Sequence, residues 1–234
     1  MCSEVVSLFI VKSGLLTVLS ISGVYSAALE SIGIKKSLYE IPGLGNRPLI
    51  IKAYPAVENY QSDLYEVYAE PYIYNLRSKL AVAVIRGEDE SQIKGEILFL
   101  QKRPPVGPTV IRGNITGLPA GRHGFHIHQS GDLRQGCQKL GEHFNPYQLQ
   151  HGGPTDPVRH AGDLGNIEAD ENGVSQVHIV DPLISLSGGP RGVVGRAIVI
   201  TSEPDDLGHG NSGNSLTNGD SGNPIACGII SYIR

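Results

Sequence analysis

The sequence contains no tryptophan and only four phenylalanines, whereas it has 30 glycines among its 234 residues. A chain so poor in large aromatic residues and so rich in glycine favours turn-rich β structure over a helical bundle. It also lacks an excess of positive charge, because 19 lysines and arginines face 23 acidic residues, giving a net charge of −4. The composition therefore excludes the basic footprint of a nucleic-acid-binding protein, and we expect no nucleic-acid partner.

Long apolar runs are also scarce. Leu15 to Val24 is apolar but short for the about 20 residues of a transmembrane helix, so we expect no stable membrane span. Lys12 precedes this run and the small residues Ser26 to Ala28 follow it, which is the outline of a secretory signal peptide. We therefore predict a signal peptide over residues 1–28 and a secreted protein. The alternative is an uncleaved N-terminal membrane anchor.

Cysteine is rare, with three in the chain. Cys2 would leave with the signal peptide, so Cys137 and Cys227 remain, and an even pair in a secreted chain suggests one disulfide. The sequon Asn114-Ile115-Thr116 is compatible with glycosylation of Asn114 in a secreted protein.

Histidine, by contrast, is concentrated. Residues 124–166 contain five of the eight histidines, namely His126, His128, His143, His151 and His160. If GFHIH is a strand, His126 and His128 point to one face and can hold a single ion. The other three histidines and Asp163 lie in a segment rich in glycine and proline. Three imidazoles and a carboxylate make a closed four-coordinate set, which predicts a structural zinc site.

Short strand patterns separated by turn signals occupy residues 78–234. The expected strands are Leu80 to Ile85, Ile93 to Leu100, Thr109 to Ile115, Gly162 to Ile167 and Val174 to Val180. This spacing is typical of an antiparallel β-sandwich. Residues 29–77 contain seven of the ten tyrosines and several prolines, and we interpret them as a partly ordered extension or linker with an extended piece at Pro48 to Tyr54.

Several ordered motifs carry a resemblance to a known family. They are GFHIH, the GC at Cys137, HFNP from His143, HGGP from His151, RHAGDLGN from Arg159, LSG from Leu186, GR at Gly195, DDLGHG from Asp205 and ACGII from Ala226. In these motifs, over residues 78 to 234, the chain resembles the copper/zinc superoxide dismutase family. The resemblance implies an all-β fold, a Greek-key β-sandwich or flattened barrel with long metal-binding loops, here with an N-terminal extension.

The resemblance also implies the site residues. The zinc ligands would be His143, His151, His160 and Asp163. The copper ligands would include His126 and His128, with His143 shared as a bridge between the two metals. Asp205 would link a zinc histidine to a copper histidine, and His123 would be a structural histidine. A disulfide between Cys137 and Cys227 would tie the loop of the bridging histidine to the last strand. The family commonly forms homodimers.

Two positions depart from the family pattern. Thr201 stands where the resemblance places the fourth copper histidine, and Pro224 stands where it places the active-site arginine. His209 lies eight positions beyond Thr201 as a weak alternative ligand. Between Arg196 and Arg234 there is no lysine or arginine, and the acidic residues Glu203, Asp205, Asp206 and Asp220 are the charges of the loop over 202–223. Superoxide is an anion, so this loop lacks the cations that would steer it.

Two functions follow from this reading. The first is dismutation of superoxide to oxygen and hydrogen peroxide, with activity reduced by the incomplete copper site. The alternative is a non-enzymatic, zinc-stabilised binding protein of superoxide dismutase type. A copper chaperone of this family fits less well, because the C-terminal tail has no cysteine and the N-terminus has only Cys2.

Overall fold

The computed structural model describes residues 49–54, 64–69, 77–88, 91–105 and 107–233. The chain divides into two compact units, the second of which contains all residues from Arg77 onward. In the first unit, β1 (Leu49–Tyr54) pairs antiparallel with β2 (Leu64–Ala69), and β1 coincides with the extended piece expected at this point. The predicted signal peptide, and most of the tyrosines of the extension, lie outside the described residues.

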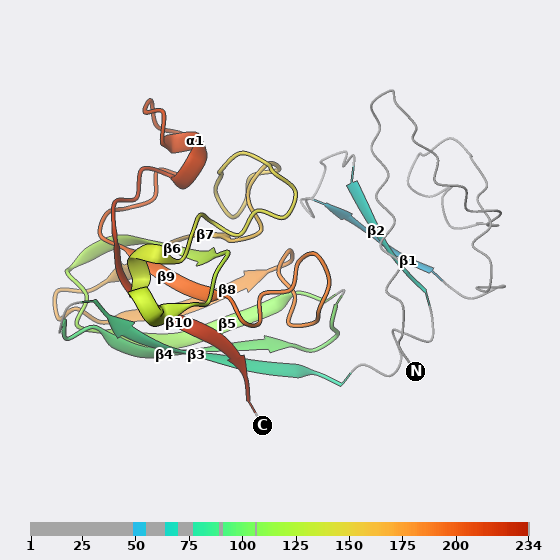
Figure 1. The fold of residues 1–234 in the computed structure, drawn as a ribbon, viewed down its shortest axis with the longest axis horizontal. Helices are drawn as coiled ribbons and strands as arrows, with labels where there is room; N and C mark the ends of the chain where they lie inside the picture. Colours follow the sequence, from blue (N-terminus) through green and yellow to red (C-terminus); the bar gives the residue numbers. More distant parts are fainter. Residues whose placement is uncertain (1–48, 55–63, 70–76, 89–90, 106, 234) are drawn as a thin grey trace. The chain divides into compact units, whose positions relative to one another are not determined.

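The second unit is a single antiparallel sheet. Its strands are β3 (Lys79–Gly87), β4 (Lys94–Gln101), β5 (Thr109–Thr116), β6 (Gly121–His128), β7 (Asp163–Ala169), β8 (Ser175–Asp181), β9 (Ala197–Thr201) and β10 (Pro224–Tyr232). They are ordered β7-β6-β9-β10-β3-β4-β5-β8. The two edge strands, β7 and β8, lie close together without sharing a hydrogen-bond ladder, so the sheet curls into a nearly closed barrel (Figure 1). The prediction of an all-β barrel is confirmed.

Strand alternation builds the core. In β3, Ala81, Ala83 and Ile85 are fully buried, while Leu80 and Val84 between and beside them are exposed. Ala83 pairs with Ile97 of β4, which is also fully buried, so the inward residues of neighbouring strands meet in register. The apolar run expected over this strand therefore supplies residues both to the core and to the outer surface.

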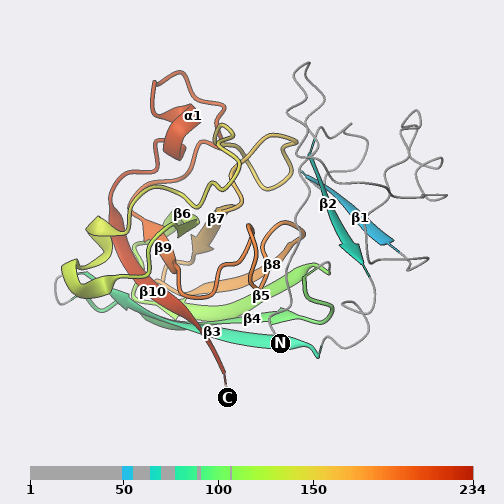
Figure 2. The same ribbon diagram turned by 45° about the vertical axis from the view of Figure 1, so that its right-hand side comes forward.

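Two long loops connect the later strands. The first, between β6 and β7, contains the short helices η2 (Leu133–Gln135) and η3 (Cys137–Lys139). The second, between β9 and β10, contains α1 (Ser215–Asn218). In both views α1 lies on the side of the barrel away from β3 and β4 (Figures 1 and 2).

The disulfide joins the first loop to the barrel. Cys137 of η3 is bonded to Cys227 of β10, with their Cα atoms 5.7 Å apart and a sequence separation of 90. Leu140, Ala197 and Val199 pack with the two sulfurs in a small buried cluster. The pairing implied by the resemblance is confirmed. Among the described residues, no helix is both long and apolar enough to cross a lipid bilayer.

Candidate metal centre

Three histidines converge on one carboxylate at the start of β7. Asp163 Oδ1 lies 2.8 Å from His143 Nδ1 and 3.1 Å from His160 Nδ1, and Asp163 Oδ2 lies 3.1 Å from His151 Nδ1. All four side chains are buried. The wrapped segment over 143–163 therefore brings together the whole set predicted to hold zinc.

The donor atoms of this set suit a tetrahedral ion. Zinc bonds of about 2.0 Å to nitrogen and oxygen place neighbouring donors about 3.3 Å apart, close to the observed separations. His151 Nδ1 is buried and has no hydrogen-bond partner, although a carboxylate oxygen lies 3.1 Å away. It is therefore directed towards a common point rather than at the carboxylate itself. These residues fit a zinc ion.

The surroundings of Asp163 keep it charged. Burial raises the pKa of this carboxyl, but hydrogen bonds from His143 and His160, with the His151 imidazole nearby, outweigh burial and hold it well below its usual value. The backbone amides of Gly152 and His160 also donate to Asp163 Oδ2, at 3.2 and 2.8 Å. The loop thus presents a carboxylate anion already bound by its own backbone, which favours a divalent cation at this point.

A second cluster shares His143 with the first. His126, His128 and His143 place their ligand nitrogens within 4.8 Å of one another. His126 and His128 are two residues apart on β6 and contribute to the same cluster, as the strand prediction requires. His143 lies beside them through an isolated β-bridge to His128. The rings of His126 and His143 are stacked, with centroids 4.0 Å apart.

Hydrogen bonds set the tautomers of the two β6 histidines. His126 Nε2 donates to Asp205 Oδ2 at 2.9 Å, and His128 Nδ1 donates to the Gly141 carbonyl at 2.6 Å. The opposite nitrogens, His126 Nδ1 and His128 Nε2, are buried and have no hydrogen-bond partner. Each ring therefore offers a lone pair to the cluster, as a copper ligand requires.

Burial keeps this cluster neutral. It lowers the pKa of His128 to about 4, with a further contribution from His143, and it lowers the pKa of His143 to about 4, with a further contribution from His126. Burial also lowers the pKa of His126, although Asp205 opposes that shift. Neutral imidazoles can bind a metal ion without first releasing a proton.

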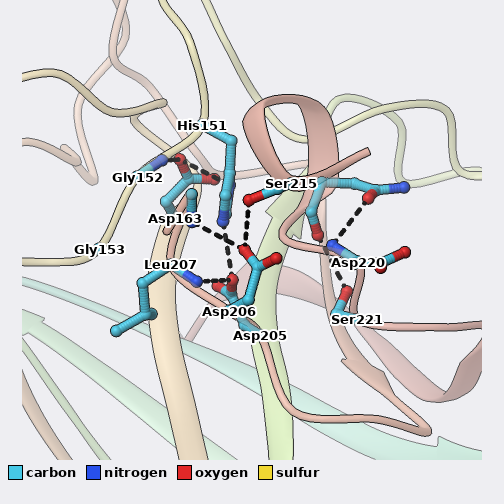
Figure 3. Close-up of polar contacts among 12 residues, drawn as sticks. His151, Gly152, Gly153, Asp163, Asp205, Asp206, Leu207, Ser215, Asp220 and Ser221 are labelled. Atoms are coloured by element: carbon cyan, nitrogen blue, oxygen red, sulfur yellow. Dashed lines mark hydrogen bonds and ion pairs between the residues drawn. The ribbon is translucent and has the colours of Figure 1, made fainter. Parts of the chain in front are cut away.

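Asp205 joins the two clusters. Its two carboxylate oxygens accept hydrogen bonds from His126 Nε2 at 2.9 Å and from His151 Nε2 at 2.8 Å (Figure 3 shows the contact with His151). Although burial lowers the pKa of His151, Asp163 and Asp205 together raise it to about 9. Burial raises the pKa of Asp205, but the two histidines outweigh it and hold that pKa well below normal. The Asn166 side chain accepts a hydrogen bond from the Asp205 amide at 2.8 Å and donates one to the Asp205 carbonyl at 2.9 Å.

Thr201 ends β9 and is nearly fully buried. Its hydroxyl donates to the Glu203 carbonyl at 3.2 Å. Space around it is tight, because a Cβ added at Gly124 would lie 2.4 Å from the Thr201 hydroxyl oxygen. This hydroxyl is therefore engaged with the backbone. His209 lies elsewhere, with 68% of its side chain exposed and Nε2 3.4 Å from Asp156 Oδ2.

Pro224, the other departure, is the cross-strand partner of Thr201. The Gln138 amide donates to the Pro224 carbonyl at 2.7 Å, so η3 is fastened to the strand at this point.

In the nearby loop, Asp206 accepts bonds from the Ser215 hydroxyl and the Gly208 amide, both at 2.9 Å (Figure 3 shows the bond to Ser215). Asp206 therefore has a local structural role, while Glu203 and Asp220 are exposed.

Four further residues bear on the predictions from the sequence. His123 is buried between the Thr201 and Pro119 carbonyls, 2.9 Å from each, as a structural histidine would be. His178 is exposed on β8. The roles of Gly141 and Asn166 were missed, because no spacing pattern indicates that a backbone carbonyl contacts His128 or that an asparagine side chain holds the backbone of Asp205.

Known proteins match this chain over the barrel. The family model for copper/zinc superoxide dismutase matches residues 93–230. A superoxide dismutase [Cu-Zn] of Ramazzottius varieornatus is 49% identical over 169 residues, which is 70% of this chain and 87% of that relative. A crystal structure of the clock protein EA4 has a TM-score of 0.62 and 44% identity, covering 68% of this chain and 97% of that one. With the fold, the disulfide and both histidine clusters in place, the chain belongs to the copper/zinc superoxide dismutase family.

Proposed function

We propose that the protein dismutes superoxide at a copper site with three imidazole ligands, beside a zinc site that holds the long loop. The single observation that carries this proposal is the pair of buried nitrogens without hydrogen-bond partners, His126 Nδ1 and His128 Nε2. A buried polar atom without a partner is costly, and a bound metal ion removes that cost. Copper, when bound, supplies the redox couple that oxidises one superoxide and reduces another.

Each residue has a distinct part in this proposal. His143, His151, His160 and Asp163 hold zinc, and their closed set orders the loop over 143–163. His126, His128 and His143 would hold copper, and His143 would also be one of the zinc ligands. Asp205 keeps the His126 and His151 rings in fixed orientations through its two carboxylate oxygens. The disulfide fixes the loop of His143 to β10.

The proposed activity is slow by the family's standard. A copper(II) ion prefers a tetragonal set of donors, and the hydroxyl of Thr201 is committed to the Glu203 carbonyl. Superoxide also meets no arginine at position 224 and no lysine or arginine between 197 and 233. Removal of cationic steering lowers the association rate of an anion by roughly 10- to 1000-fold.

A second candidate function is supported by the pairing of the two departures. Thr201 and Pro224 are cross-strand neighbours, so both replaced positions lie at one point of the barrel. The zinc residues show no comparable change. This pattern also suits a non-enzymatic protein that keeps zinc and the disulfide as a scaffold for binding. Secretion, with removal of residues 1–28, and a homodimer remain part of either proposal.

An assay of dismutation separates the two functions. Protein purified with zinc would be assayed before and after addition of one equivalent of copper, with a free-copper chelator present during the reaction. The enzyme proposal predicts catalysis that depends on copper and is lost in a variant carrying both His126→Ala and His128→Ala. Absence of catalysis at full copper occupancy would favour the scaffold.

A further inference from the structure

The outer face of the barrel carries an apolar row that crosses four strands. Leu80 of β3 pairs with Leu100 of β4, Leu100 pairs with Val110 of β5, and Val110 pairs with Val180 of β8. Leu80 is 46% exposed and Val180 is 57% exposed, and the two residues between them are partly exposed. All four therefore point away from the core, along one continuous line.

Neighbouring outward positions extend this row. Val82 and Leu98 form the next outward pair, with Leu98 41% exposed, and Val84 beyond them is 51% exposed. The solvated face of an antiparallel strand normally carries polar residues at these positions. Leu80, Val84, Leu98 and Val180 are all exposed large hydrophobic residues of the described barrel. A contiguous exposed apolar area of this kind marks an interaction surface.

Cations surround the apolar row. Lys102 and Arg103 directly follow β4 at one end, Arg112 lies in the next outward row, and Arg86 and Lys94 pair at the far end of β3 and β4. All five are exposed, and none forms an ion pair with a carboxylate of the described residues. Glu96 is the acidic residue among the outward positions of these strands. The chain carries a net charge of −4, so this face has the opposite sign to the whole.

We propose that this outer face, defined by Leu80, Leu100, Val110 and Val180 with their surrounding cations, binds the surface of an anionic phospholipid bilayer. Apolar side chains can enter the boundary between headgroups and acyl chains, while lysine and arginine contact the anionic headgroups. A sulfated polysaccharide would use the cations and leave the apolar row without a role. A second copy packed face to face would bring two sets of cations together, which is unfavourable.

The proposal is independent of the metal centre. The histidine clusters are formed by β6, β7 and the long loops, whereas the proposed face is formed by β3, β4, β5 and β8. Substitutions on the face can therefore be judged by retention of zinc and of the disulfide. Asn114 points outward from β5 beside this surface, so the protein for the experiment is prepared free of glycan.

The test measures partition of the full chain onto vesicles of phosphatidylcholine with about 30% phosphatidylserine, a composition that gives a strongly negative surface. The apolar variant carries Leu80→Gln and Val180→Gln, and its matched control carries Leu216→Gln, a residue 48% exposed on α1. The charge variant carries Lys102→Glu and Arg103→Glu, and its control carries Arg122→Glu and Lys139→Glu, which are exposed elsewhere. Comparison within full-length variants cancels any contribution of the N-terminal apolar run.

The proposal predicts that the charge variant binds these vesicles at least 25-fold more weakly, at roughly fivefold per cation lost, and that the apolar variant binds about tenfold more weakly. Both controls should bind as the unchanged chain does, and vesicles of phosphatidylcholine alone should bind weakly. Equal binding by all variants would overturn the proposal. Binding to heparin but not to vesicles, lost in the charge variant and kept in the apolar variant, would also overturn it. So would a concentration-dependent dimer that the apolar variant abolishes.

Discussion

The two histidine clusters share His143 but differ in the origin of their other members. The zinc cluster takes all its donors from one wrapped segment, and its three Nδ1 atoms lie 2.8 to 3.1 Å from the Asp163 carboxylate. The copper cluster takes two donors from β6, and the resemblance places its missing donor on β9. The set proposed for zinc has four donors, whereas the resemblance places Thr201 at the fourth position of the set proposed for copper.

The difference shows which losses a barrel tolerates. In the proposed zinc site, the four donors would hold the loop over 143–163 in shape. Thr201 keeps its place in β9 whether or not it binds metal, because it is buried and paired with β10. We therefore expect the fold to tolerate loss of a ligand at the strand position better than loss of one in the loop.

The largest expected effect is that of Asp163→Asn. The change removes the carboxylate charge on which three histidines converge, and we expect loss of zinc and a fall in unfolding free energy of about 3–5 kcal/mol. Metal analysis and thermal unfolding measure both. Asp156→Asn is the matched control in the same loop, where the carboxylate binds the Gly153 amide at 2.7 Å. If Asp163→Asn keeps zinc as firmly as this control, the zinc cluster is wrongly assigned.

The next effect is that of the disulfide, on which both clusters depend through His143. A variant carrying Cys137→Ser and Cys227→Ser opens a cross-link with a sequence separation of 90. We expect a loss of about 4 kcal/mol in unfolding free energy, measured by urea unfolding. Copper affinity should fall in the same variant, because the loop of His143 is no longer fixed to β10. A loss below about 1 kcal/mol would contradict this account.

Low pH should destabilise the folded protein through His128 and His143, which burial keeps neutral. In metal-free protein, His128 and His143 have folded-state pKa values of about 4, below the unfolded value near 6.5. The stability that they contribute is present above pH 6.5 and is lost as pH falls from 6.5 to 4, because the unfolded chain then binds more protons. We expect unfolding free energy to fall by up to about 3 kcal/mol for each of these histidines over this range. His128→Gln should flatten the dependence, and an equally steep curve in that variant would exclude His128 as its source.

Much of this centre could be predicted from the sequence. The alternation in GFHIH predicts that His126 and His128 share one face of a strand. The histidines and Asp163 of the following loop predict the set proposed for zinc. Both predictions rest on residues close together in the sequence. The outward face of β3 was missed, since Leu80 to Ile85 is apolar throughout and only the sheet shows that Leu80 and Val84 point to solvent. The contacts of Gly141 and Asn166 with this centre depend on chain crossings that no local pattern records.

Thr201→His completes the copper cluster if the resemblance places the position correctly. We expect copper(II) affinity and the dismutation rate each to rise about tenfold or more, because one good ligand interaction contributes at least about 1.4 kcal/mol. Competition with a chelator and a rate assay measure the two. The control is Thr201→Val, which removes the bond to Glu203 without adding a donor. Equal behaviour of the two variants would show that position 201 does not reach the metal.

The smallest effect concerns the approach of superoxide. Pro224→Arg should raise the association rate about tenfold at low ionic strength, and the gain should shrink as salt is added. Stopped-flow rates at several salt concentrations measure this. The matched control, Pro224→Gln, removes the proline ring and adds no charge. A gain of the same size in the control, or one insensitive to salt, would count against an electrostatic cause.

The most direct test of the difference between the clusters is metal content after competition. Protein loaded with both metals would be dialysed against a chelator of intermediate affinity, and zinc and copper per chain would then be counted. The account predicts one zinc retained per chain and most of the copper lost, with copper retained in the Thr201→His variant. Retention of a full equivalent of copper(II) by the unchanged chain, with the spectrum of a tetragonal four-nitrogen site, would contradict it.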